Sequence, residues 1–331
     1  MKKDYNIDFL RVISMLLVIV IHVANYYGRA FDKISKLSFL GEIIFNVITR
    51  VSIPIFFMIS GALLLNKNYD SKKNIKRIRS KLISLVIMSL VYYFWDKYYM
   101  HNSYSLIKML GTPGRSMLWF MYAIIALYIA LPFIKAMIDN MDEHLDKLFV
   151  ILWLFFNGVL YLVKFKVNIT YPVPIVSGTY YLGYFIIGYL ILKYKDKIDY
   201  KKYNWHLILI SLLCFITNIF LTYFLSQKRG YSFTSLLAYR NILMMIPSLA
   251  IFILIYFNRK NRENKFIEFI SPYSFGIYLV HGILLNVLMN YFDYIHIISF
   301  VGIPICTIIL LLASLLVVYI LKKVPLLRNI F

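Results

Sequence analysis

The chain is divided into ten long apolar runs that are separated by short, mostly basic segments. The runs fall at residues 7–28, 39–65, 82–97, 117–134, 148–163, 173–192, 205–225, 238–257, 273–292 and 297–321. An apolar run of about 20 residues is long enough to cross a bilayer as a helix. Because the bilayer core offers no partners to backbone N–H and C=O groups, such runs must be helical. We therefore predict an all-α, polytopic membrane protein with about ten transmembrane helices.

The composition leaves no room for a sizeable soluble domain. Of the 331 residues, 61% are hydrophobic and 15% are charged, whereas soluble domains contain roughly 45–50% apolar and about 25% charged residues. We predict that residues 1–331 form a single integral-membrane domain without an appended soluble domain. Its spans lie between about residues 7 and 321.

The basic residues indicate orientation in a membrane rather than nucleic-acid binding. The net charge is +21, but the Lys and Arg residues gather between the apolar runs. If the N-terminus lies inside, 23 of the 36 Lys and Arg residues fall on inner segments and 11 on outer segments. Cytoplasmic loops carry an excess of Lys and Arg. The sequence therefore predicts a multi-pass protein of the cell membrane with both termini in the cytoplasm.

The first span carries two ionisable residues, Arg11 and His22, on one helix face. Eleven residues make three full turns plus about 20°, which separates the two by about 16 Å along the axis. Ionisable groups inside a bilayer are costly and usually functional. We predict that Arg11 holds an anionic ligand near the cytoplasmic surface and that His22 is a general base deeper in the same cavity. Alternatively, Arg11 reaches lipid headgroups and His22 bonds a neighbouring helix.

The second span carries Arg50 about eleven residues in from its outer end. Pro54 follows and is expected to interrupt the backbone ladder near mid-membrane. We predict that Arg50 faces the reaction cavity and takes part in catalysis; an ion pair with Glu42 is the alternative. Gly61, further along the span, is predicted to allow close packing against another helix.

Seven cations gather between residues 67 and 81. One interpretation is a phosphate clamp formed by Lys76, Arg77 and Arg79, because arginine binds phosphate in a bidentate manner. The alternative is attraction to anionic membrane lipid, which is worth about 1 kcal/mol per cation.

Three further residues are candidates for substrate binding: Trp119, Tyr122 and His281. The first two also suit anchoring in the aromatic belt, and His281 also suits a hydrogen-bonded packing role. No metal site is expected, because Cys214 and Cys306 both lie inside apolar runs and no metal-binding spacing is present.

Several motifs occur in an order that resembles the acyltransferase 3 family of integral-membrane acyltransferases, over about residues 5 to 321. They are Arg11-x10-His22, Arg50…Pro54-Ile-Phe-Phe-Met-Ile-Ser60-Gly61, the basic loop with Lys76, Arg77 and Arg79, Leu118-Trp119-Phe120…Leu127-Tyr128…Leu131-Pro132, Tyr181-Leu-Gly-Tyr184-Phe-Ile-Ile-Gly188-Tyr189 and Ser274-Phe-Gly-Ile-Tyr278-Leu-Val-His281.

The resemblance implies transfer of an acyl group, usually acetyl, from cytoplasmic acyl-CoA to a hydroxyl of a cell-envelope glycan or lipid-linked sugar. It implies that His22 is essential, that Arg11 assists at the donor end, and that an Arg-x-x-Arg motif binds the donor. Here that motif departs from the pattern, since Lys76 stands first and Arg79 last. Two alternatives remain: a glycan transporter or flippase, and a membrane sensor or assembly subunit without turnover.

Overall fold

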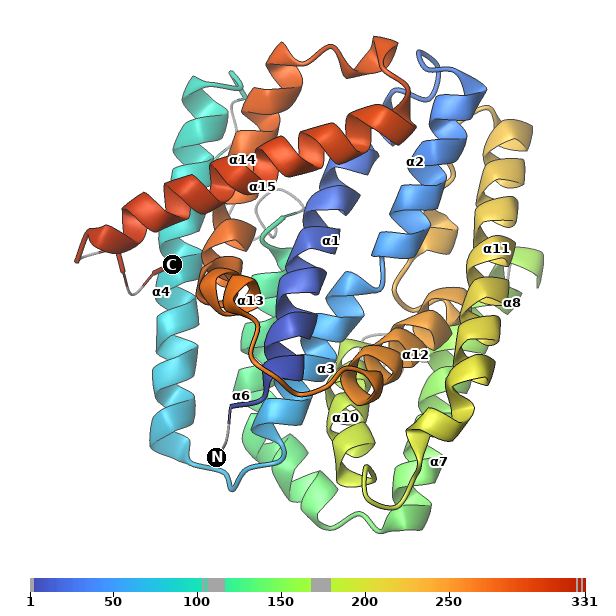
Figure 1. Ribbon diagram of the computed structural model, residues 1–331, viewed down its shortest axis with the longest axis vertical. Coiled ribbons are helices and arrows are strands. Elements are labelled where there is room, and N and C mark those ends of the chain that lie inside the picture. Colours follow the sequence, from blue (N-terminus) through green and yellow to red (C-terminus); the bar gives the residue numbers. More distant parts are fainter. Residues whose placement is uncertain (1–2, 103–104, 106–116, 168–179, 326, 329) are drawn as a thin grey trace.

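The computed structural model describes residues 3–102, 105, 117–167, 180–325, 327–328 and 330–331. Every regular element in these residues is a helix, and the helices form one bundle (Figure 1). The all-α prediction is therefore confirmed for the described part of the chain.

The described helices include long α-helices and several short 3₁₀-helices. In chain order they are α1 (Tyr5–Arg29), α2 (Lys36–Thr49), α3 (Ser52–Leu64), α4 (Ser71–Tyr98), α6 (Trp119–Asp139), α7 (Glu143–Trp153), the π-helix η1 (Leu154–Val159), α8 (Leu160–Val167), α10 (Tyr180–Lys193), η2 (Tyr200–Tyr203), α11 (Asn204–Arg229), η3 (Ser235–Leu237), α12 (Ile242–Asn258), α13 (Lys265–Ile270), η4 (Ser271–Tyr273), α14 (Ser274–Tyr291), η5 (Tyr294–His296) and α15 (Ser299–Lys323).

Nine helical stretches of the described chain are long and apolar enough to cross a membrane, with α2 and α3 counted together as one. They correspond to nine of the ten predicted spans, and they support a multi-pass membrane protein. The remaining predicted span, residues 173–192, is described only from residue 180, where α10 forms a shorter apolar helix. Residues 173–179 lie outside the described residues. The cytoplasmic position of the termini stays a prediction.

Helix α1 lies in the middle of the bundle, where it contacts α2, α3, α12, α14 and α15 (Figure 1). Its N-cap residue is Asp4, whose carboxylate accepts hydrogen bonds from the backbone N–H groups of Asn6 and Ile7 at 3.0 and 3.2 Å. Such a cap stabilises a helix start by about 1 kcal/mol. We call the end of the bundle that holds the start of α1 and residues 65–71 the basic end. The opposite end, where α1 leads into α2, is the far end.

The second span is broken between α2 and α3, at Arg50 and Val51. The sequence placed this break at Pro54, but the helix resumes before the proline, with a hydrogen bond from the Ile55 N–H to the Val51 carbonyl at 3.1 Å. Proline is tolerated in the first turn of a helix because the N–H that it lacks has no partner there. Arg50 therefore lies at the break itself rather than one turn before it.

Helices α3 and α10 pack closely through two glycines. A Cβ atom placed on Gly61 would lie 1.6 Å from the carbonyl oxygen of Phe185. One placed on Gly188 would lie 2.2 Å from the carbonyl oxygen of Met58. Real atoms cannot approach so closely, so the two backbones meet at positions where neither helix has a side chain. The predicted packing role of Gly61 is confirmed.

Replacing Gly61 with leucine is expected to destabilise the fold, because the added side chain must push α10 away from α3. Overpacking of a tight contact typically costs about 1–3 kcal/mol, and a clash with backbone leaves less room to relax. Thermal unfolding of the protein in detergent measures the effect. Ala136→Leu, which also introduces a leucine but at an exposed position of α6, is the control. An unchanged midpoint for Gly61→Leu contradicts the packing argument.

Candidate functional site

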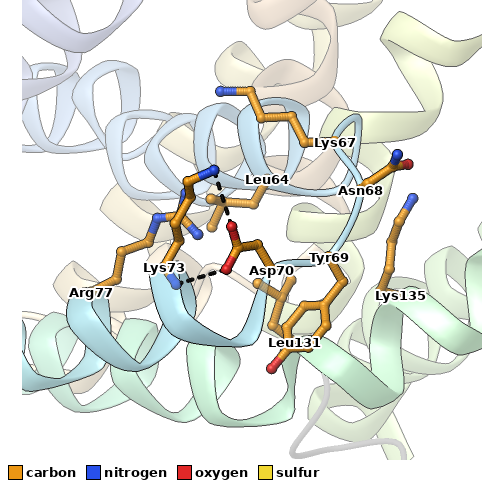
Figure 2. Close-up of a pocket in the computed structure, with 9 residues that line it drawn as sticks. All are labelled: Leu64, Lys67, Asn68, Tyr69, Asp70, Lys73, Arg77, Leu131 and Lys135. Carbon is orange, nitrogen blue, oxygen red and sulfur yellow. Dashed lines mark hydrogen bonds and ion pairs between the residues drawn. The ribbon is translucent and has the colours of Figure 1, made fainter.

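Four cavities form a row from the basic end to the far end, and neighbouring cavities share lining residues. The first, the basic cavity, is lined by Leu64, Lys67, Asn68, Tyr69, Asp70, Lys73, Arg77, Leu131 and Lys135 (Figure 2). The second, the middle cavity, has a volume of about 240 Å³ and is lined in part by Arg11. Leu64 and Arg77 line both cavities, so the two adjoin.

The row continues towards the far end with two more cavities. The histidine cavity, of about 130 Å³, is lined by His22 and Arg50 among others. Ile53, Phe120 and Tyr278 line both the middle and the histidine cavity and form the boundary between them. The far cavity, of about 380 Å³, shares one residue of α1 with the histidine cavity and opens at the far end.

The basic cavity has an excess of positive charge. Four cations surround it, and Asp70 is the carboxylate among its lining residues (Figure 2). Asp70 accepts a hydrogen bond from the backbone N–H of Lys73 at 3.0 Å and also pairs with the Lys73 Nζ at 3.0 Å. These bonds hold the pKa of the Asp70 carboxyl below its usual value, so Asp70 is ionised at neutral pH. Within the described chain, Lys67 and Arg77 have no carboxylate partner, which leaves them for an anion.

One face of α4 points its cations along the cavities. Lys73, Arg77 and Lys81 are spaced four residues apart, and side chains at this spacing share a helix face. Lys73 and Arg77 line the basic cavity, while Arg77 and Lys81 line the middle cavity. Lys76 and Arg79, by contrast, are exposed on other faces of α4 and lie outside the lining of both cavities. Of the three predicted clamp residues, Arg77 alone lines these two cavities.

Arg11 is held at the wall of the middle cavity. Its Nη1 donates to the Asp8 carboxylate at 2.5 Å and to the Ser271 hydroxyl at 3.1 Å. The Ser271 hydroxyl donates in turn to Asp8 at 3.1 Å. Among the described residues, the other two guanidinium nitrogens of Arg11 have no hydrogen-bond partner. The guanidinium is therefore fixed in position and retains donors for an anionic ligand.

Apolar and aromatic side chains line the middle cavity on the side that adjoins the histidine cavity. Its wall includes Ile, Leu and Phe residues from α3, α6 and α14. At the boundary, the Tyr278 hydroxyl donates to the Met117 carbonyl at 2.5 Å, and this bond holds the ring of Tyr278 in place. Such a wall suits a thin, weakly polar chain rather than a charged group.

His22 lies beside a second buried histidine, His281, with 5.0 Å between the ring centroids. The Nδ1 atom of His281 is 2.6 Å from the Tyr278 carbonyl oxygen. Because a carbonyl only accepts hydrogen bonds, Nδ1 carries a proton, and in the neutral ring Nε2 is the acceptor. Within the described chain, this buried Nε2 has no hydrogen-bond partner. His281 therefore backs the ring of His22, whereas His22 lies on the cavity wall.

Arg50 reaches the histidine cavity and is joined to Glu42 through an asparagine. Its Nε donates to Asn46 Oδ1 at 2.8 Å, and Asn46 Nδ2 donates to Glu42 at 2.7 Å and to Asn25 at 2.8 Å. The guanidinium also lies over the Tyr239 ring, 5.6 Å from its centroid. Among the described residues, Arg50 and Glu42 form no direct ion pair. Asn46 thus links Arg50 to Glu42 in place of the direct ion pair that was the alternative prediction from the sequence.

Trp119 lines the histidine cavity, whereas Tyr122 does not. The Trp119 ring stacks against those of Tyr181 and Tyr239, with centroids 5.2 and 5.9 Å away, and the three rings form one aromatic cluster. Tyr122 is partly buried and packs against the hydrophobic core. Both residues were predicted from the sequence as candidates for substrate binding, but only Trp119 lies on the wall of this cavity.

Several residues of the site were not singled out from the sequence. Lys81 and Asn46 follow Arg77 and Glu42 by four residues, so helix spacing could have found them. Tyr239 lies in the irregular segment before α12, where no periodicity indicates which way a side chain points.

The chemistry available here is anion binding and proton transfer. The described residues contain no group of three or more His, Cys, Asp or Glu side chains that could hold a metal ion. Cations gather towards the basic end, and a histidine and an arginine share one small cavity towards the other.

Comparison with known proteins gives one extensive match. A family model described as an acyltransferase domain, acyltransferase 3, matches residues 4–322. An amino-acid racemase of Enterococcus faecalis is 31% identical over 100 residues, which amount to 28% of this chain and 13% of the racemase. No solved structure matches the chain.

Proposed function

We propose a specific reaction for this chain, which belongs to the acyltransferase 3 family and is therefore a membrane acyltransferase. The reaction is transfer of an acyl group, which we expect to be acetyl, from acyl-CoA to a hydroxyl of a cell-envelope glycan or lipid-linked sugar. One observation carries the proposal. A row of cavities begins among cations, continues between mainly apolar side chains, and reaches a histidine beside an arginine.

The donor fits this row in one direction. Coenzyme A has several phosphates at one end and a long, thin arm that ends in the thioester. The phosphates would bind among Lys67, Lys73 and Arg77 in the basic cavity, with Arg11 and Lys81 further along. The arm would then pass Tyr278, at the boundary of the two cavities, and present the thioester carbonyl in the histidine cavity.

The histidine cavity supplies groups for the transfer itself. His22 takes the proton of the acceptor hydroxyl while the hydroxyl oxygen attacks the thioester carbonyl carbon. Negative charge develops on the carbonyl oxygen, where the Arg50 guanidinium would stabilise it. When the intermediate collapses, the C–S bond breaks and the coenzyme thiol leaves with the proton from His22. A two-step route, in which His22 carries the acyl group before the hydroxyl receives it, uses the same residues.

The proposal includes an orientation. The excess of Lys and Arg supports placing the basic end in the cytoplasm, where acyl-CoA is made. The far end would then face outwards, towards the envelope. A glycan on that side would meet the thioester at His22 without crossing the membrane.

The test supplies membranes that contain the protein with acetyl-CoA labelled in the acetyl group and with an envelope glycan. Alkali-labile label on the glycan is expected, and membranes without the protein are the control. If the protein instead moves glycan across the membrane without consuming acetyl-CoA, a transporter replaces the proposed enzyme. A panel of longer acyl-CoA donors tests the assignment of acetyl.

Two arginines of α4 allow a matched test of the donor site. Arg77→Gln should weaken acyl-CoA binding by about tenfold, the value of one lost charge-assisted hydrogen bond. Arg79→Gln, which removes the same charge from an exposed position, should have a smaller effect. The difference should shrink as salt rises, because salt screens exposed charges. Apparent donor affinity at low and high salt measures both effects, and equal losses for the two variants contradict this placement of the phosphates.

A further inference from the structure

The far cavity differs in chemistry from the cavities assigned to the donor. Seven of its nine described lining residues have side chains that form hydrogen bonds, whereas the middle cavity is lined mainly by apolar residues. Arg29, Asp32 and Tyr231 are exposed at its rim, and the carboxyl group of Glu42, a buried residue of α2, forms part of its inner wall. A polar molecule that arrives from the far end can therefore enter it and remain solvated by protein groups.

The inner wall presents a hydrogen-bond donor beside an acceptor. Asn46 Nδ2 donates to Glu42 Oε1 and to Asn25 Oδ1. Within the described chain, Glu42 Oε2 and the two N–H bonds of Asn25 Nδ2 have no partner. Glu42 lies close against α1, since a Cβ placed on Gly28 would be 3.0 Å from Oε1. An acceptor and a donor held side by side match neighbouring hydroxyls, each of which both donates and accepts.

The charges of the far cavity select against an anion. Its lining contains one cation, Arg29, and two carboxylates, Asp32 and Glu42. An anion placed beside the buried Glu42 side chain is disfavoured, because burial weakens the solvation of both groups and a negative neighbour opposes ionisation of Glu42. Phe31 and Tyr231 also line the cavity, and aromatic rings provide apolar surface for the C–H groups of a sugar. A neutral polyhydroxyl ring satisfies all three features.

We propose that the far cavity binds the acceptor as an uncharged sugar residue and delivers one of its hydroxyls past Asn25 to His22. Asn25 lines both the far and the histidine cavity, and it lies three residues, or about 4.5 Å along the helix axis, from His22. The delivery step rests on the proposed function. The binding step does not, and it is tested without a donor.

Binding is measured by protection of a cysteine in the cavity. Ser232→Cys places a thiol on the cavity wall, and the native Cys214 and Cys306 are buried. Methyl glucoside or methyl N-acetylglucosaminide should slow its reaction with a maleimide, and methyl glucuronide should be about tenfold less effective. Lys33→Cys, on an exposed residue outside the lining, should show no protection. If neutral glycosides give no protection, or the glucuronide protects better, the inference is wrong.

A second variant tests the cause of the selection. In the Ser232→Cys background, Glu42→Gln removes the ionisable carboxyl group and keeps the size of the side chain. It should bring protection by methyl glucuronide close to that by methyl glucoside. Unchanged discrimination shows that Glu42 does not select the ligand and overturns the charge argument. Because no acyl-CoA is present, sugar protection in a protein that never transfers acyl groups would contradict the proposed function alone.

Discussion

Replacing His22 with alanine is expected to abolish acyl transfer and to leave the protein folded. A general base positioned at the reacting hydroxyl contributes about 10²–10⁴ in rate. His281 cannot take over, because it is fully buried and its Nδ1 is bound to the Tyr278 carbonyl. In the described chain, no other histidine lines the cavity that His22 shares with Arg50. The rate of a single turnover, with the labelled donor already bound, measures the loss of chemistry apart from any loss of affinity.

The control for this variant is His206→Ala, which removes an exposed histidine of α11 far from the site in sequence. Both variants should unfold at the temperature of the unchanged protein in detergent. Both should also bind acyl-CoA normally, because the phosphate contacts lie elsewhere. Normal turnover by His22→Ala removes His22 from the mechanism. Label that stays on the unchanged protein, but not on His22→Ala, when the acceptor is withheld supports the route through an acylated histidine.

The main features of the fold and one part of the site could be predicted from local pattern. Apolar runs predict membrane helices because the bilayer leaves the backbone no alternative. The placement of Arg11 and His22 along one line follows from helix geometry alone, since both lie on α1. Their predicted roles remain to be tested. Gly61 could be assigned to packing because a glycine inside an apolar helix allows close approach of a neighbour.

The remainder of the site depends on contacts between helices that are distant in sequence. His281 on α14 contacts His22 on α1, and the spacing of residues within either helix does not indicate that contact. The basic segment illustrates a second limit. Its charge pointed to an anion site, but charge alone does not distinguish Arg77, which lines the cavities, from Arg79, which is exposed. Orientation about the axis of α4 separates them, and it is set by packing of the whole bundle.

The Arg50→Met variant is expected to fold normally, and its turnover rate should fall by a factor of about 10²–10³. This is the usual loss when one stabiliser of a developing oxyanion is removed. Glu42→Gln should keep its turnover at saturating acceptor. The contrast follows from Asn46, which bonds to both side chains. After either substitution, the remaining side chain keeps its hydrogen bond to Asn46, so neither is left without a polar partner. Arg240→Met, which removes an arginine that lies over the Tyr161 ring outside the histidine cavity, is the matched control.

A structural ion pair predicts a different pattern for the same variants. Removal of either partner of a buried pair costs about 3–5 kcal/mol, because an uncompensated charge remains. Arg50→Met and Glu42→Gln would then be similarly unstable, and the double variant would recover much of the loss. Unfolding midpoints in detergent, measured beside turnover for the two single variants and the double variant, separate the two accounts. We expect the double variant to be as inactive as Arg50→Met and no more stable than either single variant. Recovery of stability in the double variant would mean that Arg50 holds α2 together rather than serving the reaction.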